Sequence, residues 1–107
     1  MGYSNELINR IAEVFKVLSE PMRLKILDSL RHGEKNVSEL IKLTGSQQAN
    51  VSKHLGIMKK AGVVTARRKG LNIYYSLRDK RFFSICNSVC EYLAKLHEEE
   101  DGLYNKE

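Results

Sequence analysis

Two cysteines stand four residues apart in the last quarter of the chain, at Cys86 and Cys90. In a helix this spacing places both thiols on one face about one turn apart, and His97 continues that face. Such a pair of thiolates binds a soft metal or metalloid ion, with a third ligand from a second copy of the chain, or reacts with oxidants or is persulfidated. The alternative is that both thiols simply pack as small apolar side chains.

A second chemical feature is a strongly basic tract between residues 53 and 81. It holds nine cations against Asp79 alone, a net charge of +8, whereas the whole chain carries +5. Such a block is typical of a surface that binds a polyanion, and the alternative is an ordinary solvated surface. The nine cations are Lys53, Lys59, Lys60, Arg67, Arg68, Lys69, Arg78, Lys80 and Arg81.

Length and composition restrict the class of protein. The 107 residues are 42% hydrophobic and 29% charged, as in one ordinary globular domain, and we expect a single domain over 1–107. No apolar run approaches the ~20 residues that cross a bilayer and no signal peptide opens the chain, so we expect no membrane partner. Two cysteines without a disulfide framework fit the reducing cytoplasm, where we expect the protein to reside.

Hydrophobic periodicity predicts the elements that position these groups. Apolar residues recur at helical steps in most of the chain, and the period changes to alternation around Lys69 and Gly70. Pro21 suits the first turn of the second helix, and Ser38 is expected to cap the third. The predicted helices span about 5–18, 21–32, 38–44, 48–60 and 79–98, and the predicted strands span 63–69 and 71–77.

This order predicts a mainly α fold with a β-hairpin wing (α+β), that is, a winged helix-turn-helix. The helix-turn-helix occupies about 38–61 and the wing about 63–77. The first and last helices, about 5–18 and 79–98, have more apolar surface than a small monomer can bury, so we expect a homodimer through both. The expected interface residues are Leu7, Ile8, Ile11, Phe82, Val89, Leu93 and Leu96.

Several motifs resemble the ArsR/SmtB family of winged-helix repressors, over about residues 10–93. The run 18–27 (LSEPMRLKIL) resembles the family's second helix, 37–40 (VSEL) and 48–55 (QANVSKHL) its helix-turn-helix, and 67–77 (RRKGLNIYYSL) its wing. The resemblance implies a homodimeric repressor that releases its operator DNA when an inducer, often a metal ion, binds. One departure is Gln47, which stands where the family has a capping serine or threonine, so we expect either that Ser46 caps instead or that the first turn of the helix is looser.

We expect the fourth predicted helix to enter the major groove of double-stranded DNA with the residues that do not face the core. The wing is expected to reach phosphates or the minor groove, with Arg67 and Arg68 together contributing about two to the slope of affinity against salt. The alternative for the wing is that its cations only keep an exposed edge strand from pairing with strands of other molecules. The expected DNA contacts are Gln48, Ala49, Ser52, Lys53, His54, Arg67, Arg68, Lys69 and Asn72.

The known sensing residues of the family are mostly absent from this chain. The family's arsenic-sensing thiols are absent at 36–40, of its zinc-sensing pattern only Asp79 remains, and its second-helix redox thiol is absent at Asp28. What remains is the hypothesis that Cys86 and Cys90 sense a thiophilic ion or an oxidant; the alternative is a thiol-independent repressor with no metal or redox input. No other cofactor is expected. The pattern offers no phosphate loop or converging catalytic groups, so we expect no enzyme.

Overall fold

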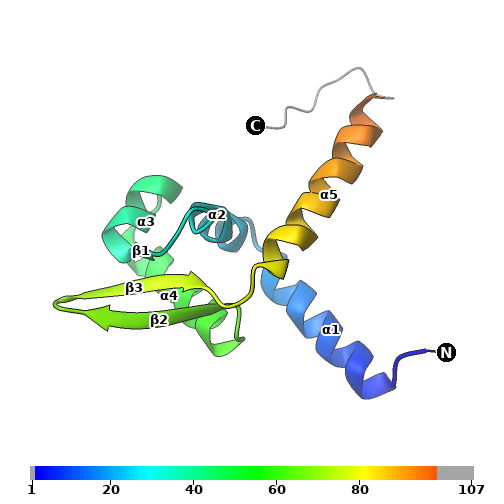
Figure 1. Ribbon diagram of the computed structural model, residues 1–107, viewed down its shortest axis with the longest axis horizontal. Coiled ribbons are helices and arrows are strands. Elements are labelled where there is room, and N and C mark those ends of the chain that lie inside the picture. Colours follow the sequence, from blue (N-terminus) through cyan, green and yellow to red (C-terminus); the bar gives the residue numbers. More distant parts are fainter. Residues whose placement is uncertain (1, 99–107) are drawn as a thin grey trace.

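The computed structural model describes residues 2–98; Met1 and residues 99–107 lie outside the described part. Within residues 2–98 the chain forms five helices and a three-stranded sheet (Figure 1). A compact unit of α2, α3, α4 and the sheet carries α1 and α5 as two arms that diverge from one corner. The elements are α1 (Asn5–Leu18), α2 (Pro21–Ser29), β1 (Lys35–Asn36), α3 (Val37–Thr44), α4 (Gln48–Lys60), β2 (Val64–Lys69), β3 (Asn72–Leu77) and α5 (Arg81–Glu98).

The structure confirms the predicted winged helix-turn-helix. Helices α1 and α4 have the predicted bounds, and Pro21 opens α2 as predicted, because it needs no backbone N–H there. Gly45 ends α3 in the left-handed region at φ 69° and turns the chain toward α4. No helix within residues 2–98 has the length and apolar character needed to span a bilayer.

The predicted caps of α3 and α4 and the predicted start of α5 are wrong. Asn36, not Ser38, caps α3: its side chain accepts from the backbone N–H of Glu39, whose carboxylate accepts from the Asn36 N–H, both at 2.9 Å. Ser46 does not cap α4, because its hydroxyl accepts from the Asn50 amide at 2.8 Å and Gln47 takes the cap position without a side-chain hydrogen bond. The last helix begins at Arg81, two residues later than predicted.

The sheet has one more strand than the predicted hairpin. Its order is β1-β3-β2, all antiparallel, so β3 is the central strand. The additional strand, β1, is only two residues long and pairs Lys35 with Tyr75 and Asn36 with Tyr74, which is too short for any alternation to be visible in the sequence. The hairpin turn is Gly70–Leu71, with Gly70 at φ 63°, a conformation that favours glycine.

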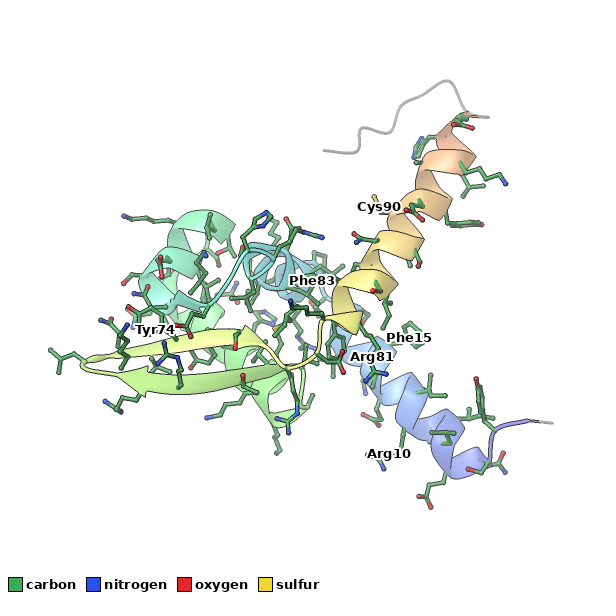
Figure 2. All side chains as sticks on the ribbon, in the orientation of Figure 1. Arg10, Phe15, Tyr74, Arg81, Phe83 and Cys90 are labelled. Carbon is green, nitrogen blue, oxygen red and sulfur yellow. The ribbon has the colours of Figure 1, made fainter. Side chains whose placement is uncertain are left out.

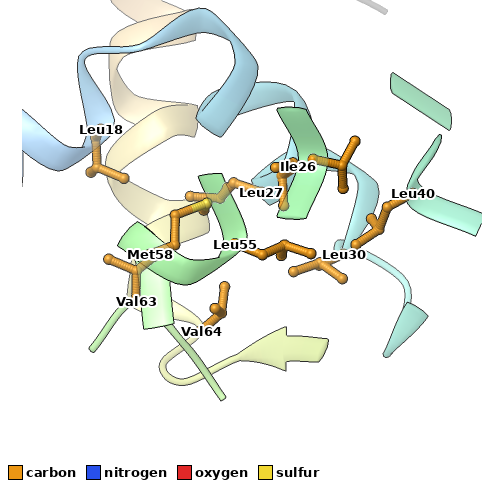
Figure 3. Packing of buried hydrophobic residues seen from close by; sticks show 10 residues of the cluster. Leu18, Ile26, Leu27, Leu30, Leu40, Leu55, Met58, Val63 and Val64 are labelled. Carbon is orange, nitrogen blue, oxygen red and sulfur yellow. The ribbon is translucent and has the colours of Figure 1, made fainter. Parts of the chain in front are cut away.

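One hydrophobic core holds the compact unit together (Figure 3). It joins the inner faces of α2, α3 and α4 to the start of β2 and the end of α1, with Leu40 and Leu55 fully buried. The phase of α4 is therefore fixed by packing. The ten members are Leu18, Ile26, Leu27, Leu30, Leu40, Val51, Leu55, Met58, Val63 and Val64.

The two arms bury much less. Within Arg81–Glu98 no residue is buried, and only Leu18 is buried in α1. Large apolar side chains stand exposed on both arms, including Phe15 at 55% and Val89 at 51%. Of the residues expected at an interface, Leu7, Ile8, Val89, Leu93 and Leu96 are exposed, Ile11 is half-buried, and Phe82 packs against the core instead.

Candidate nucleic-acid interface

One face of α4 is turned to solvent at the edge of the compact unit. Val51, Leu55 and Met58 are completely buried, and this leaves the side chains of the first two turns on the other face outside. Gln48, Ala49, Ser52 and Lys53 are all exposed there, and the helix has no acidic residue in its first turn. The helix N-terminus, with its positive dipole end, and Lys53 give this face a positive potential. The arrangement suits an anionic partner.

His54 lies on the opposite side from these residues, so its expected contact with a DNA phosphate is wrong. It is 8% exposed, and its Nδ1 accepts a hydrogen bond from Arg23 Nε at 3.2 Å. Arg23 also donates through Nη1 to the Val17 carbonyl at 3.2 Å, and so links α4 to α2 and to the end of α1. The sequence spacing indicates this burial: His54 stands three residues after Val51 and four before Met58, and so lies on the same helix face as these two core residues.

The environment of His54 keeps it neutral. Burial lowers the pKa of His54 most, the cations Arg23 and Lys53 lower it further, and Glu20 opposes them. A neutral ring is required here, since only an unprotonated Nδ1 can accept from Arg23. The imidazole is therefore a structural acceptor between α2 and α4.

Acid is expected to destabilise the protein through this group. Because the folded pKa of His54 lies below its unfolded value of about 6.5, the unfolded state binds more protons in that interval. This contribution to stability is complete above pH ~6.5 and is lost as the pH falls toward the folded pKa. Urea unfolding at pH 7.5 and 5.5 measures the loss, and His54→Gln, which still offers Arg23 an acceptor, should show less of it. An equal loss in both proteins would contradict the assignment.

The cations of the wing do not form one cluster. Residues paired across β2 and β3 share a face, so Arg67, Lys69 and Asn72 lie on one face of the hairpin and Arg68 on the other. Arg67 is held by Glu34 through two hydrogen bonds, Nε to Oε2 at 2.8 Å and Nη2 to Oε1 at 2.5 Å. Nothing in the sequence indicated Glu34 as its partner, because 33 residues separate them.

The two cysteines line a groove between α5 and the ends of α1 and α2. Its volume is about 410 Å³, and Phe15, Leu24 and Leu93 are among its apolar walls. Burial raises the pKa of the Cys86 thiol, Asp28 raises it too, and Arg31 opposes both. Within residues 2–98 no cluster of three His, Cys, Asp or Glu side chains is arranged to hold a metal ion. A single chain therefore offers these thiols a shared groove but no complete ligand set.

Two ion pairs flank the groove and the start of α5. Arg31 pairs with Asp28 at 3.1 Å and lies over the Phe83 ring at 4.8 Å, so it joins α2 to α5. Asp79 accepts from the backbone and the guanidinium of Arg81, and this lowers its pKa to about 2. Figure 2 shows Phe83 and Arg81 at the base of α5, where this arm leaves the compact unit.

Comparison with known proteins gives the same identification. Residues 20–66 match the model of the bacterial regulatory proteins of the arsR family. The transcriptional repressor SdpR of Bacillus subtilis is 42% identical over 82 residues, covering 77% of this chain and 91% of SdpR. The regulator Rv0081 of Mycobacterium tuberculosis is 40% identical over 75 residues, and the match spans 69% of this chain and 66% of Rv0081.

Solved structures agree with the sequence comparisons. The crystal structure of Rv0081 superimposes with a TM-score of 0.80 at 33% identity, over 91% of this chain and 98% of that one. The homodimeric winged helix-turn-helix DNA-binding domain of Mb0332 from Mycobacterium bovis gives a TM-score of 0.73 at 33% identity, over 85% and 90% of the two chains. The chain belongs to the arsR family of bacterial regulators, which are winged helix-turn-helix transcription factors and not enzymes.

Proposed function

We propose that this protein is a homodimeric transcriptional repressor that binds double-stranded operator DNA through α4 and the wing. The observation that carries the proposal is the exposed face of α4, where polar and cationic side chains are presented by a helix whose other face is locked into the core. A major groove ~12 Å wide admits such a helix. SdpR, a repressor, supports the direction of regulation.

The side chains suit distinct roles in this complex. Gln48 has the donor and acceptor that pair with adenine, and Ala49 offers a methyl group to thymine. Ser52 and Lys53 donate to bases or phosphates, whereas the wing cations contact the backbone and carry no sequence information. The proposed contacts are Gln48, Ala49, Ser52, Lys53, Arg68, Lys69 and Asn72.

The homodimer is proposed from the two arms. One module makes few base contacts, and a second module related by a two-fold axis doubles them at half-sites ~34 Å apart. The exposed apolar side chains of α1 and α5 provide the surface for this pairing, and a further apolar groove of about 450 Å³ runs between α1 and Val63. The Mb0332 domain is itself homodimeric, which supports a homodimer here.

Binding to the DNA upstream of the protein's own gene tests the proposal. We expect Gln48→Ala to weaken operator binding by about 5- to 150-fold, corresponding to ~1–3 kcal/mol for a bidentate base contact, and to leave random duplex unaffected. Lys53→Ala should weaken both and lower the salt slope by about one. Fluorescence anisotropy at several salt concentrations measures all three proteins. Equal effects of Gln48→Ala on operator and random DNA would contradict base recognition by α4.

We further propose that Cys86 and Cys90 couple an inducer to DNA binding. Both line the groove where α5 meets α1 and α2, so a bound thiophilic ion or an oxidised thiol there changes how the arm packs. A coupling free energy of ~1–3 kcal/mol changes affinity about 5- to 150-fold. Burial raises the pKa of Cys86, so its thiol stays protonated at neutral pH. Because the thiolate is the reactive form, we expect the reaction of Cys86 to accelerate as the pH rises.

Serine substitution of both cysteines tests this input. The wild-type protein is expected to release operator DNA on addition of arsenite, cadmium or peroxide, and the Cys86→Ser/Cys90→Ser variant is expected to stay bound. Single variants show which thiol is required. Equal release from wild type and double variant would place the sensor elsewhere, whereas no release from either protein would favour the thiol-independent repressor.

A further inference from the structure

One cation of the wing reaches across the whole sheet. Arg67 belongs to β2, the edge strand of the hairpin, and pairs in register with Tyr74 of the central strand β3. Its guanidinium lies 6.0 Å from the centre of the Tyr74 ring and ends on Glu34, the residue immediately before β1. The Arg67 side chain therefore spans all three strands, from one edge of the sheet to the other.

The contact has the geometry of a strong ion pair. Two parallel hydrogen bonds join the guanidinium to both carboxylate oxygens, and the Glu34 side chain is only 33% exposed. Such bidentate pairs are the exception to the rule that surface ion pairs contribute little. The hydrogen bond from Arg67 also lowers the pKa of Glu34, so the carboxylate stays charged throughout the neutral range.

The pair ties the wing to the helix-turn-helix. Glu34 lies two residues before Asn36, whose side chain caps α3, the first helix of that unit. A displacement of the hairpin relative to α3 would have to break the two hydrogen bonds from Arg67 to Glu34. The other two wing cations differ, since Arg68 and Lys69 are exposed and form no ion pair within residues 2–98.

We propose that Glu34 is a positioning residue, which withholds Arg67 from the DNA backbone and uses it to hold the wing in place. The inference rests on the proposed DNA-binding function and revises the expectation that Arg67 and Arg68 together contribute about two to the salt slope. Phosphate contacts strengthen binding to every sequence alike, so a cation withheld from them lowers the affinity for operator and random DNA by the same factor and makes both less dependent on salt. Glu34 thereby lowers the salt dependence of DNA binding by about one phosphate contact.

The salt dependence of random-duplex binding isolates this effect. Arg67→Ala is expected to leave the slope of log affinity against log salt unchanged, whereas Arg68→Ala, the matched control, lowers it by about 0.9. Glu34→Ala is expected to steepen the slope by about 0.9, because the released Arg67 then reaches a phosphate. Between 50 and 200 mM salt this steepening is an additional loss of affinity of about 3.5-fold.

The double variant separates this account from a simple change in net charge. In Glu34→Ala/Arg67→Ala the slope should return to the wild-type value, although the carboxylate is absent. A steeper slope in the double variant, or a shallower one in Arg67→Ala alone, would overturn the inference while leaving DNA binding intact. Salt-independent binding by the wild type would instead contradict the proposed function itself. Circular dichroism checks folding, and Glu34→Gln, which keeps the shape of the side chain, replaces Glu34→Ala if that variant unfolds.

Discussion

Leu93→Asp is expected to convert the protein to monomers and to weaken binding to a two-half-site operator by at least about 100-fold. Leu93 is 38% exposed on the apolar face of α5, close to Val89 and Leu96 on the same stripe. A carboxylate buried there without a partner costs several kcal/mol, and each 1.4 kcal/mol is tenfold in the dimer constant. A monomer then keeps the contacts of one half-site only.

Sedimentation equilibrium and operator binding, measured on the same samples, test this expectation. Ser84→Asp is the matched control, because Ser84 is exposed on the opposite side of the same helix and gains the same charge. The control should remain dimeric and bind as the wild type does. A Leu93→Asp protein that is still a dimer with unchanged affinity would place the interface elsewhere.

Leu55→Ala is expected to lower the free energy of unfolding by about 2–5 kcal/mol. Leu55 has no exposed surface and lies at the centre of the core that fixes α4 against α2 and α3, as Figure 3 shows. Removing its isobutyl group leaves a cavity that the surrounding helices fill only in part. In a domain of this size such a loss is a large fraction of the total stability.

Urea unfolding at a fixed protein concentration measures the change, since the stability of a dimer depends on concentration. Leu71→Ala provides the same chemical change at the turn of the wing, where the side chain is 99% exposed. This control should alter the free energy of unfolding by less than ~0.5 kcal/mol. A loss below about 1 kcal/mol for Leu55→Ala would mean that α4 is not anchored as described.

The sequence was most informative where neighbouring residues decide the structure. The bounds of α1 and α4 were predicted because their apolar residues recur at helical steps, and Pro21 and Gly45 mark a helix start and a helix end by their backbone requirements alone. The wing turn at Gly70 was found for the same reason. These features together were sufficient for the fold class.

The same local reasoning failed where two candidates for one role stand close together. Ser38 and Asn36 both belong to residue types that cap helices well. Asn36 caps α3 because β1 pairs with β3 and ends at Asn36, so that the helix begins at the next residue. His54 was expected among the DNA contacts, although its position in α4 faces the core and Arg23 supplies the donor that makes its burial tolerable.

The sequence by itself determined the winged helix-turn-helix, the exposed residues of α4 and the apolar faces of the arms, because these follow from periodicity and turn chemistry over a few residues. Only the tertiary structure decided which polar groups serve as contacts within the fold: Arg23 with His54 across 31 residues, and Arg67 with Glu34 across 33. The physical reason is that an ion pair or a buried hydrogen bond depends on distance in space, which helical or strand periodicity does not encode.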